Sequence, residues 1–151
     1  MTLRFSKPCG KPHTLTCLRN DGSVTWSPVG SSVGAKHDLI HYAVETTLGY
    51  TEAFLGLVAQ GRDLDDFGTK CGVKSAYTTE EQWAESIVGF LQWPTLTGSE
   101  FAAQLAALTP APSVTPEQFT RICQQIADLH ARWDALPPGG TLELDFPTPR
   151  L

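Results

Sequence analysis

Hydrophobic and polar residues alternate near the beginning of the chain. Leu3 and Phe5 have polar neighbours on both sides, and the segment 13–19 repeats the alternation. A period of two is typical of a β-strand with one buried face. Residues 21–22, Asp-Gly, separate this second run from a third β-rich run, and Gly accepts the positive φ that a tight hairpin turn requires. We therefore expect a three-stranded antiparallel meander within residues 2–29.

The middle of the chain has the period of an amphipathic helix. Apolar residues recur at three- and four-residue spacing between short breaks rich in Gly, Pro and Thr. Three of the predicted helices start with a Thr followed three residues later by Glu or Gln, which is the pattern of a reciprocal N-terminal cap. We expect five helices, at about residues 35–48 and 51–60 and with starts at Thr79, Thr97 and Thr115. Residues 61–77 are expected to form a long loop.

A final alternating run is expected to complete the sheet. Leu142, Leu144 and Phe146 alternate with polar residues, and this strand is predicted to return to the N-terminal meander. The prediction is an α+β fold: a small antiparallel sheet, made of the N-terminal three-stranded meander and a C-terminal strand, packed against about five helices. Residues 1–151 are expected to form one domain, with the four Trp residues as core anchors.

Composition narrows the classes of partner. The 151 residues carry 16 acidic and 11 basic side chains, for a formal net charge of −5. Binding to nucleic acid is not expected, because clustered Lys and Arg supply most of the affinity for phosphate. A membrane partner is not expected either, because no run approaches the ~20 apolar residues of a spanning helix. The four scattered Cys residues and the lack of a secretory signal pattern favour reduced thiols in a cytoplasmic protein.

A histidine pair on the first predicted helix is the leading candidate for chemistry. His37 and His41 are four residues apart, so their imidazoles lie one above the other on a helix and can point at the same metal ion. Helices that bind zinc use this spacing in the H-E-x-x-H motif, where a Glu follows the first His. Here Asp38 holds that position, so the protease interpretation is weakened. The alternative is that His41 is a hydrogen-bonded packing residue.

Other groups would have to complete such a site. Glu45 lies two helical turns from His37, about 12 Å along the helix, which is too far to share one ion with it. Glu45 is therefore considered either as a proton-handling carboxylate or as a group that orients His41. Candidates for a third ligand are His13, His130 and the Asp residues of segment 63–66.

The sequence leaves three functions open. The first is a small cytoplasmic domain that binds an unidentified small molecule or protein partner; the sequence is also compatible with a homodimer. The second is a metal-dependent hydrolase or lyase, in which His37 and His41 hold a divalent ion such as zinc while Asp38 or Glu45 carries a proton. The third is a serine hydrolase, because residues 30–34 match the pattern G-x-S-x-G with Ser32 at its centre.

Overall fold

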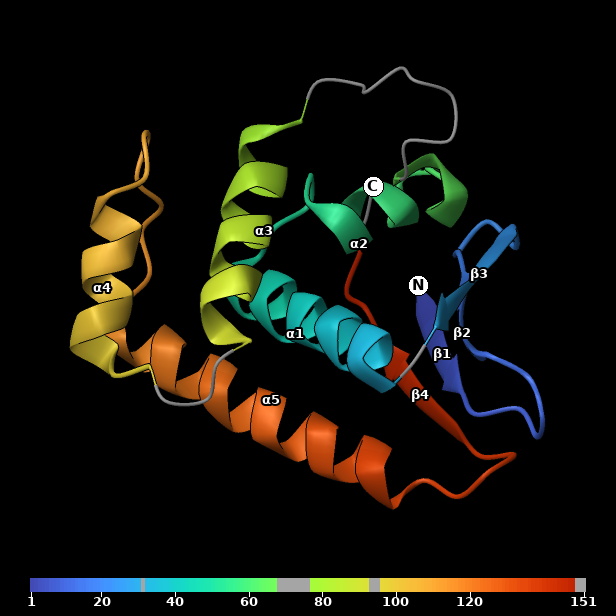
Figure 1. The fold of residues 1–151 in the computed structure, drawn as a ribbon. Helices are drawn as coiled ribbons and strands as arrows, with labels where there is room; N and C mark the ends of the chain where they lie inside the picture. The colour runs from blue at the N-terminus through green and yellow to red at the C-terminus, as the bar shows by residue number, and fades with distance from the viewer. Residues whose placement is uncertain (31, 68–76, 93–95, 149–151) are drawn as a thin grey trace.

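A four-stranded antiparallel sheet packs against a layer of helices, as the sequence predicts (Figure 1). The computed structural model describes residues 1–30, 32–67, 77–92 and 96–148. The strand order is β3-β2-β1-β4, and α1 lies in the middle of the molecule, where it contacts β2, β3, α2, α3 and α5. Within the described part of the chain, no helix is long and apolar enough to cross a membrane.

The elements follow the predicted order. The strands are β1 (Thr2–Ser6), β2 (His13–Leu18), β3 (Val24–Gly30) and β4 (Thr141–Asp145). The helices are α1 (Ser32–Leu48), α2 (Phe54–Ala59), the short 3₁₀ helix η1 (Leu64–Phe67), α3 (Thr79–Leu91), α4 (Gly98–Ala106) and α5 (Pro116–Ala135). Residues 61–77, predicted to be a loop, contain η1, and 68–76 lie outside the described residues.

The sheet has the register that the alternation requires. Leu3 of β1 pairs with Cys17 of β2 on one side and with Leu144 of β4 on the other, and all three side chains are buried. The predicted hairpin between β2 and β3 is also confirmed: Gly22 has a φ of +88°, and its N–H donates to the Arg19 carbonyl at 3.0 Å. The first and last strands are therefore neighbours in one sheet.

Reciprocal caps begin three of the helices. Thr97 with Glu100 starts α4 and Thr115 with Gln118 starts α5, as predicted. The start predicted at Thr79 is displaced by one residue, because Thr78 is the cap of α3 and its partner is Glu81. Two adjacent Thr residues make both starts compatible with the sequence. The acidic side chain of Glu81 completes the hydrogen bonds of the box that begins at Thr78.

The Trp residues are only partly in the core. Trp133 is fully buried and Trp83 is half-buried, but the Trp26 side chain is 61% exposed, so its assignment as a core anchor was wrong. Trp26 pairs with Thr16 on the face of the sheet opposite to the buried Leu3 and Cys17. Alternation along β3 therefore turns Trp26 away from the helices. Trp93 lies outside the described residues.

A glycine sets the distance between α1 and β3. A Cβ atom on Gly34 would lie 1.9 Å from the carbonyl oxygen of Val29, which is far inside van der Waals contact with backbone. The first turn of α1 therefore approaches β3 more closely than any side chain allows. This approach determines where His37, one turn later, lies relative to the sheet.

We expect Gly34→Ala to lower the free energy of unfolding by about 1–3 kcal/mol or more, because the added methyl group overpacks a rigid backbone contact. Gly89→Ala is the matched control, since Gly89 is also helical and a Cβ there meets no atom within 4 Å. The control should be neutral or stabilising by up to ~1 kcal/mol through helix propensity. Equal effects of the two substitutions in urea unfolding would contradict the close approach.

Candidate metal centre

One face of α1 carries a row of polar side chains into the interior. His37, His41 and Glu45 follow one another at four-residue spacing, and burial increases along the row. His37 is half-buried, His41 is 1% exposed and Glu45 is fully buried. The rings of His37 and His41 meet edge to face with their centroids 5.0 Å apart. The helix therefore brings the two imidazoles together as their spacing predicts.

The buried Glu45 carboxylate lies behind His41. It accepts hydrogen bonds from the backbone N–H groups of Leu55 and Gly56, at 2.9 and 3.1 Å, at the start of α2. Its other contact is with Nδ1 of His41 at 3.2 Å. Glu45 does not line the pocket in front of the histidines. This placement favours the orienting role over direct proton transfer to a substrate.

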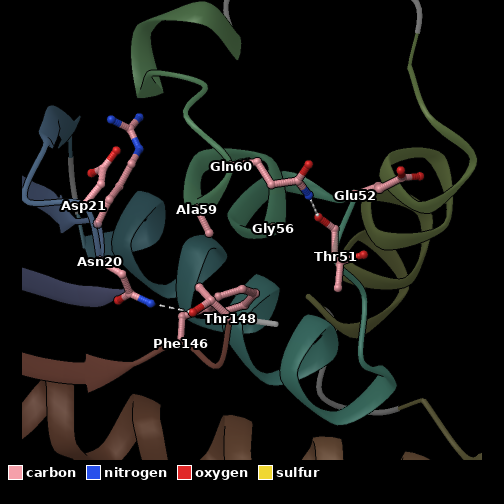
Figure 2. Close-up of a pocket in the computed structure, with 10 residues that line it drawn as sticks. Asn20, Asp21, Thr51, Glu52, Gly56, Ala59, Gln60, Phe146 and Thr148 are labelled. Carbon is pink, nitrogen blue, oxygen red and sulfur yellow. Dashed lines mark hydrogen bonds between the residues drawn. The ribbon is translucent and has the colours of Figure 1, made fainter. Parts of the chain in front are cut away.

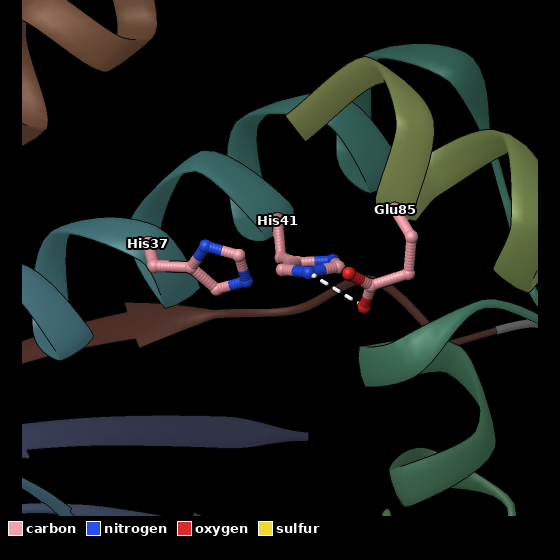
Figure 3. Close-up of side chains that lie close together, drawn as sticks. All are labelled: His37, His41 and Glu85. Atoms are coloured by element: carbon pink, nitrogen blue, oxygen red, sulfur yellow. Dashed lines mark ion pairs between the residues drawn. The ribbon is translucent and has the colours of Figure 1, made fainter. Parts of the chain in front are cut away.

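Helix α3 contributes the third member of the cluster. Glu85 lies one turn beyond the capping residue Glu81, and its Oε1 is 3.1 Å from Nε2 of His41. One ligand atom from each of His37, His41 and Glu85 lies within 4.8 Å of the other two (Figure 3). The Glu85 side chain is 53% exposed, so it has room to move toward the histidines.

The two histidines have opposite electrostatic environments. Burial lowers the pKa of His37, and the neighbouring His41 lowers it further. Burial also disfavours the charged form of His41, but hydrogen bonds and charge attraction from Glu45 and Glu85 outweigh it and raise the pKa of His41 to about 9. The hydrogen bond with His41 lowers the pKa of Glu85. Without metal, His41 is therefore an imidazolium held between two carboxylates at neutral pH.

A small pocket opens in front of the cluster. Its volume is about 130 Å³, and its walls come from α1, α2, η1 and α3. The lining residues are His37, Asp38, His41, Phe54, Phe67, Tyr77, Glu81 and Glu85. Glu81 is engaged by Arg62 at 3.0 Å and by the α3 cap, so it is not a free ligand. Burial raises the pKa of the Asp38 carboxyl to about 6, with His41 opposing and Glu85 adding to the shift.

The proposed third ligands from the sequence lie elsewhere. His13 packs edge to face against Trp133, and Nε2 of His130 contacts the Lys36 carbonyl at 3.1 Å. Arg19 pairs with Asp63 of the 63–66 segment at 2.9 Å. Sequence reasoning missed Glu85, although its position one turn after a capping Glu on an amphipathic helix was visible. The side chain of Ser32, the serine-hydrolase candidate, is not among those described.

A larger pocket of about 620 Å³ lies on another side of α2 (Figure 2). Its residues are Arg19, Asn20, Asp21, Thr51, Glu52, Gly56, Ala59, Gln60, Phe146 and Thr148. Polar side chains there bind protein groups: Asn20 donates to Thr148 at 2.7 Å, and Gln60 donates to the Thr51 carbonyl. The Arg19 guanidinium is held by the Val58 and Arg62 carbonyls. This pocket brings together no reactive cluster comparable with His37, His41 and Glu85.

The apo protein should lose stability as pH rises from 7 to 9. The folded pKa of His41, about 9, is above the usual value of 6.5, so the native state holds an extra proton in this window. The stabilisation is complete below about pH 6.5 and is lost as pH passes 9, at up to about 1.4 kcal/mol per pH unit. Unfolding free energies of the wild type and His41→Gln, compared at each pH without metal, measure it. Identical slopes for the two proteins would contradict the ion triad.

Comparison of the chain with models of known protein families, with curated proteins and with solved structures finds no match. The case for a function therefore rests on the geometry of this site.

Proposed function

We propose that the chain binds a divalent metal ion, zinc, through His37, His41 and Glu85, and that it is a metal-dependent hydrolase. The observation that carries the proposal is the convergence of three ligand atoms within 4.8 Å, one of them on a histidine whose other nitrogen contacts a buried carboxylate. Convergence of exposed carboxylates alone would be weak support. Here, two imidazoles from one helix face a carboxylate from another.

The donor set suits zinc. Two His residues and one Glu form one of the ligand sets of catalytic zinc sites, in which the fourth position holds water or substrate. Bonds of 2.0–2.1 Å in a tetrahedron separate neighbouring ligand atoms by roughly 3.3 Å. The 3.1 Å between His41 Nε2 and Glu85 Oε1 is already near that value. A rotation of the half-buried His37 ring or of the exposed Glu85 side chain would close the longer separation.

Glu45 fixes His41 in the form that binds metal. Metal-bound histidines usually donate their second N–H to a carboxylate or carbonyl, which sets the tautomer and ring orientation. With the proton on Nδ1 shared with Glu45, Nε2 of His41 presents a lone pair toward Glu85 and the pocket. On His37, Nδ1 lies against the Gln92 amide. An amide turned with its oxygen to Nδ1–H would leave Nε2 as the ligand atom.

The pocket supplies the remaining requirements of hydrolysis. Bound zinc lowers the pKa of a coordinated water to about 7. Asp38 lines the same pocket and follows His37 directly in α1, so its carboxyl is the group placed to accept a proton there. Phe54 and Phe67, whose rings meet edge to face at 4.9 Å, restrict access of bulk water to one side.

The second candidate is a ligand- or partner-binding domain without metal. It is favoured by the ion triad itself, because Glu45 and Glu85 satisfy both nitrogens of His41 without an ion. Zinc must displace the proton on Nε2, so the two functions differ in whether metal competes with that proton. The cytoplasmic location and the homodimer expected from the sequence stay predictions.

We expect zinc to raise the melting temperature of untagged protein by several degrees, because an ion at 100 times its dissociation constant adds about 2.7 kcal/mol to stability. His37→Gln and Glu85→Gln should each remove most of this gain. Glu117→Gln, a carboxylate-to-amide change at an exposed position on α5, is the control and should leave the gain intact. A shift that survives both site substitutions would place the ion elsewhere, and no shift in the wild type would leave the metal-free function.

Zinc affinity should also rise with pH. A ligand whose pKa is about 9 without metal must lose its proton to bind, so affinity should increase about tenfold per unit from pH 7 and level off near pH 9. Calorimetric titrations in buffers of different ionisation enthalpy will measure the released proton. Affinity that is independent of pH above 7 would show that His41 is not a ligand.

A further inference from the structure

A second pocket, of about 380 Å³, adjoins the candidate metal centre. It shares four lining residues with the smaller pocket: His37, Asp38, Phe54 and Phe67. The others come from the sheet, the start of α1 and η1: Leu15, Ser27, Pro28, Val29, Gly34 and Leu64. A molecule in this second pocket, the side pocket, is therefore next to His37 and the reactive groups.

The lining of the side pocket is mainly apolar. Leu15, Val29 and Leu64 form walls on β2, β3 and η1, and the two Phe rings separate the side pocket from the cluster. Among the described residues that line either pocket, none is Lys or Arg. A substrate carboxylate or phosphate would find no cationic side chain there, whereas hydrocarbon would find contact on several sides.

Fixed contacts hold the walls in place. The close approach of Gly34 to the Val29 backbone sets the gap between α1 and β3. The Leu64 N–H donates to Thr25 Oγ1 at 3.0 Å, which fastens η1 to the same strand. The space is therefore a feature of packed backbone elements. Its volume exceeds the ~150 Å³ of an apolar cavity that accommodates benzene.

We infer that the substrate is an uncharged ester or amide whose apolar acyl group, of the size of a phenyl ring or larger, occupies the side pocket. This inference rests on the proposed function, because the acyl carbonyl must lie at the His37–His41–Glu85 cluster. In the reaction, a water oxygen bonds to the acyl carbon and the ester C–O or amide C–N bond breaks. Asp38 passes one water proton to the leaving oxygen or nitrogen, and the products are a carboxylic acid and an alcohol or amine.

Hydroxamates, which bind zinc through their own oxygens, test the inference by calorimetry on the zinc-loaded protein. We expect benzohydroxamate to bind at least about tenfold more tightly than acetohydroxamate, because the ring buries apolar area in the side pocket. 4-Carboxybenzohydroxamate should lose most of that preference, since its carboxylate meets an apolar wall. The probes contain the metal-binding group in common, so their differences report the side pocket.

Two substitutions locate the effect. Ser27 lines the side pocket, so Ser27→Phe should fill it and reduce the affinity for benzohydroxamate to that for acetohydroxamate, with zinc affinity unchanged. Thr16→Phe is the control, because Thr16 lies on the neighbouring strand but on the outer face of the sheet, paired with Trp26. It should keep the full preference. If Ser27→Phe does not fold, Ser27→Leu gives a smaller reduction in the same direction.

The failures are distinguishable. A wild-type protein that binds zinc but binds the two uncharged probes equally, or prefers the carboxylate probe, would overturn the inference and leave the metal site standing. A preference unaffected by the Ser27 substitutions would also overturn it, because the ring would then bind outside the side pocket. A wild-type protein that binds no zinc would overturn the proposed function and the inference with it.

Discussion

The fully buried carboxylate of Glu45 is the interaction on which the site depends. An ionised carboxylate in the interior is costly unless hydrogen-bond donors surround it. Glu45 has two backbone donors from the first turn of α2 and the His41 ring on its other side. It therefore holds α2 against α1 and sets the orientation of His41 at once. Removing the carboxylate would leave both the backbone donors and the imidazole without their partner.

This arrangement explains the layout of the surrounding walls. α2 is held at its first turn, so Phe54 stands over His41 with ring centroids 5.1 Å apart and then meets Phe67. On the other side of the histidines, α3 brings Glu85 to Nε2 of His41. At the sheet side, Gly34 lets α1 come close enough to β3 for His37 and Asp38 to border both pockets. The polar row on α1 is thus enclosed by elements that each have their own fixed contact.

The local patterns of the sequence predict the fold and half of the site. Alternation gives the strands and their pairing, and caps give the starts of α4 and α5. The spacing of His37 and His41 is a property of one helix, so it is visible in the sequence. Glu85 is not, because its contact with His41 joins positions 44 residues apart through the packing of α3 on α1. Trp26 was misplaced because its alternation is compatible with either face, and the faces differ only in which one the helices cover.

The central claim is that His37, His41 and Glu85 coordinate one metal ion. X-ray absorption spectroscopy of the protein loaded with one equivalent of zinc tests it most directly, since imidazole ligands give a characteristic multiple-scattering signal. The structure predicts a four-coordinate zinc with two imidazole nitrogens and oxygen ligands at about 2.0–2.1 Å, and loss of one imidazole in His37→Gln. A zinc environment of oxygens alone, or one unchanged by that substitution, would contradict the site.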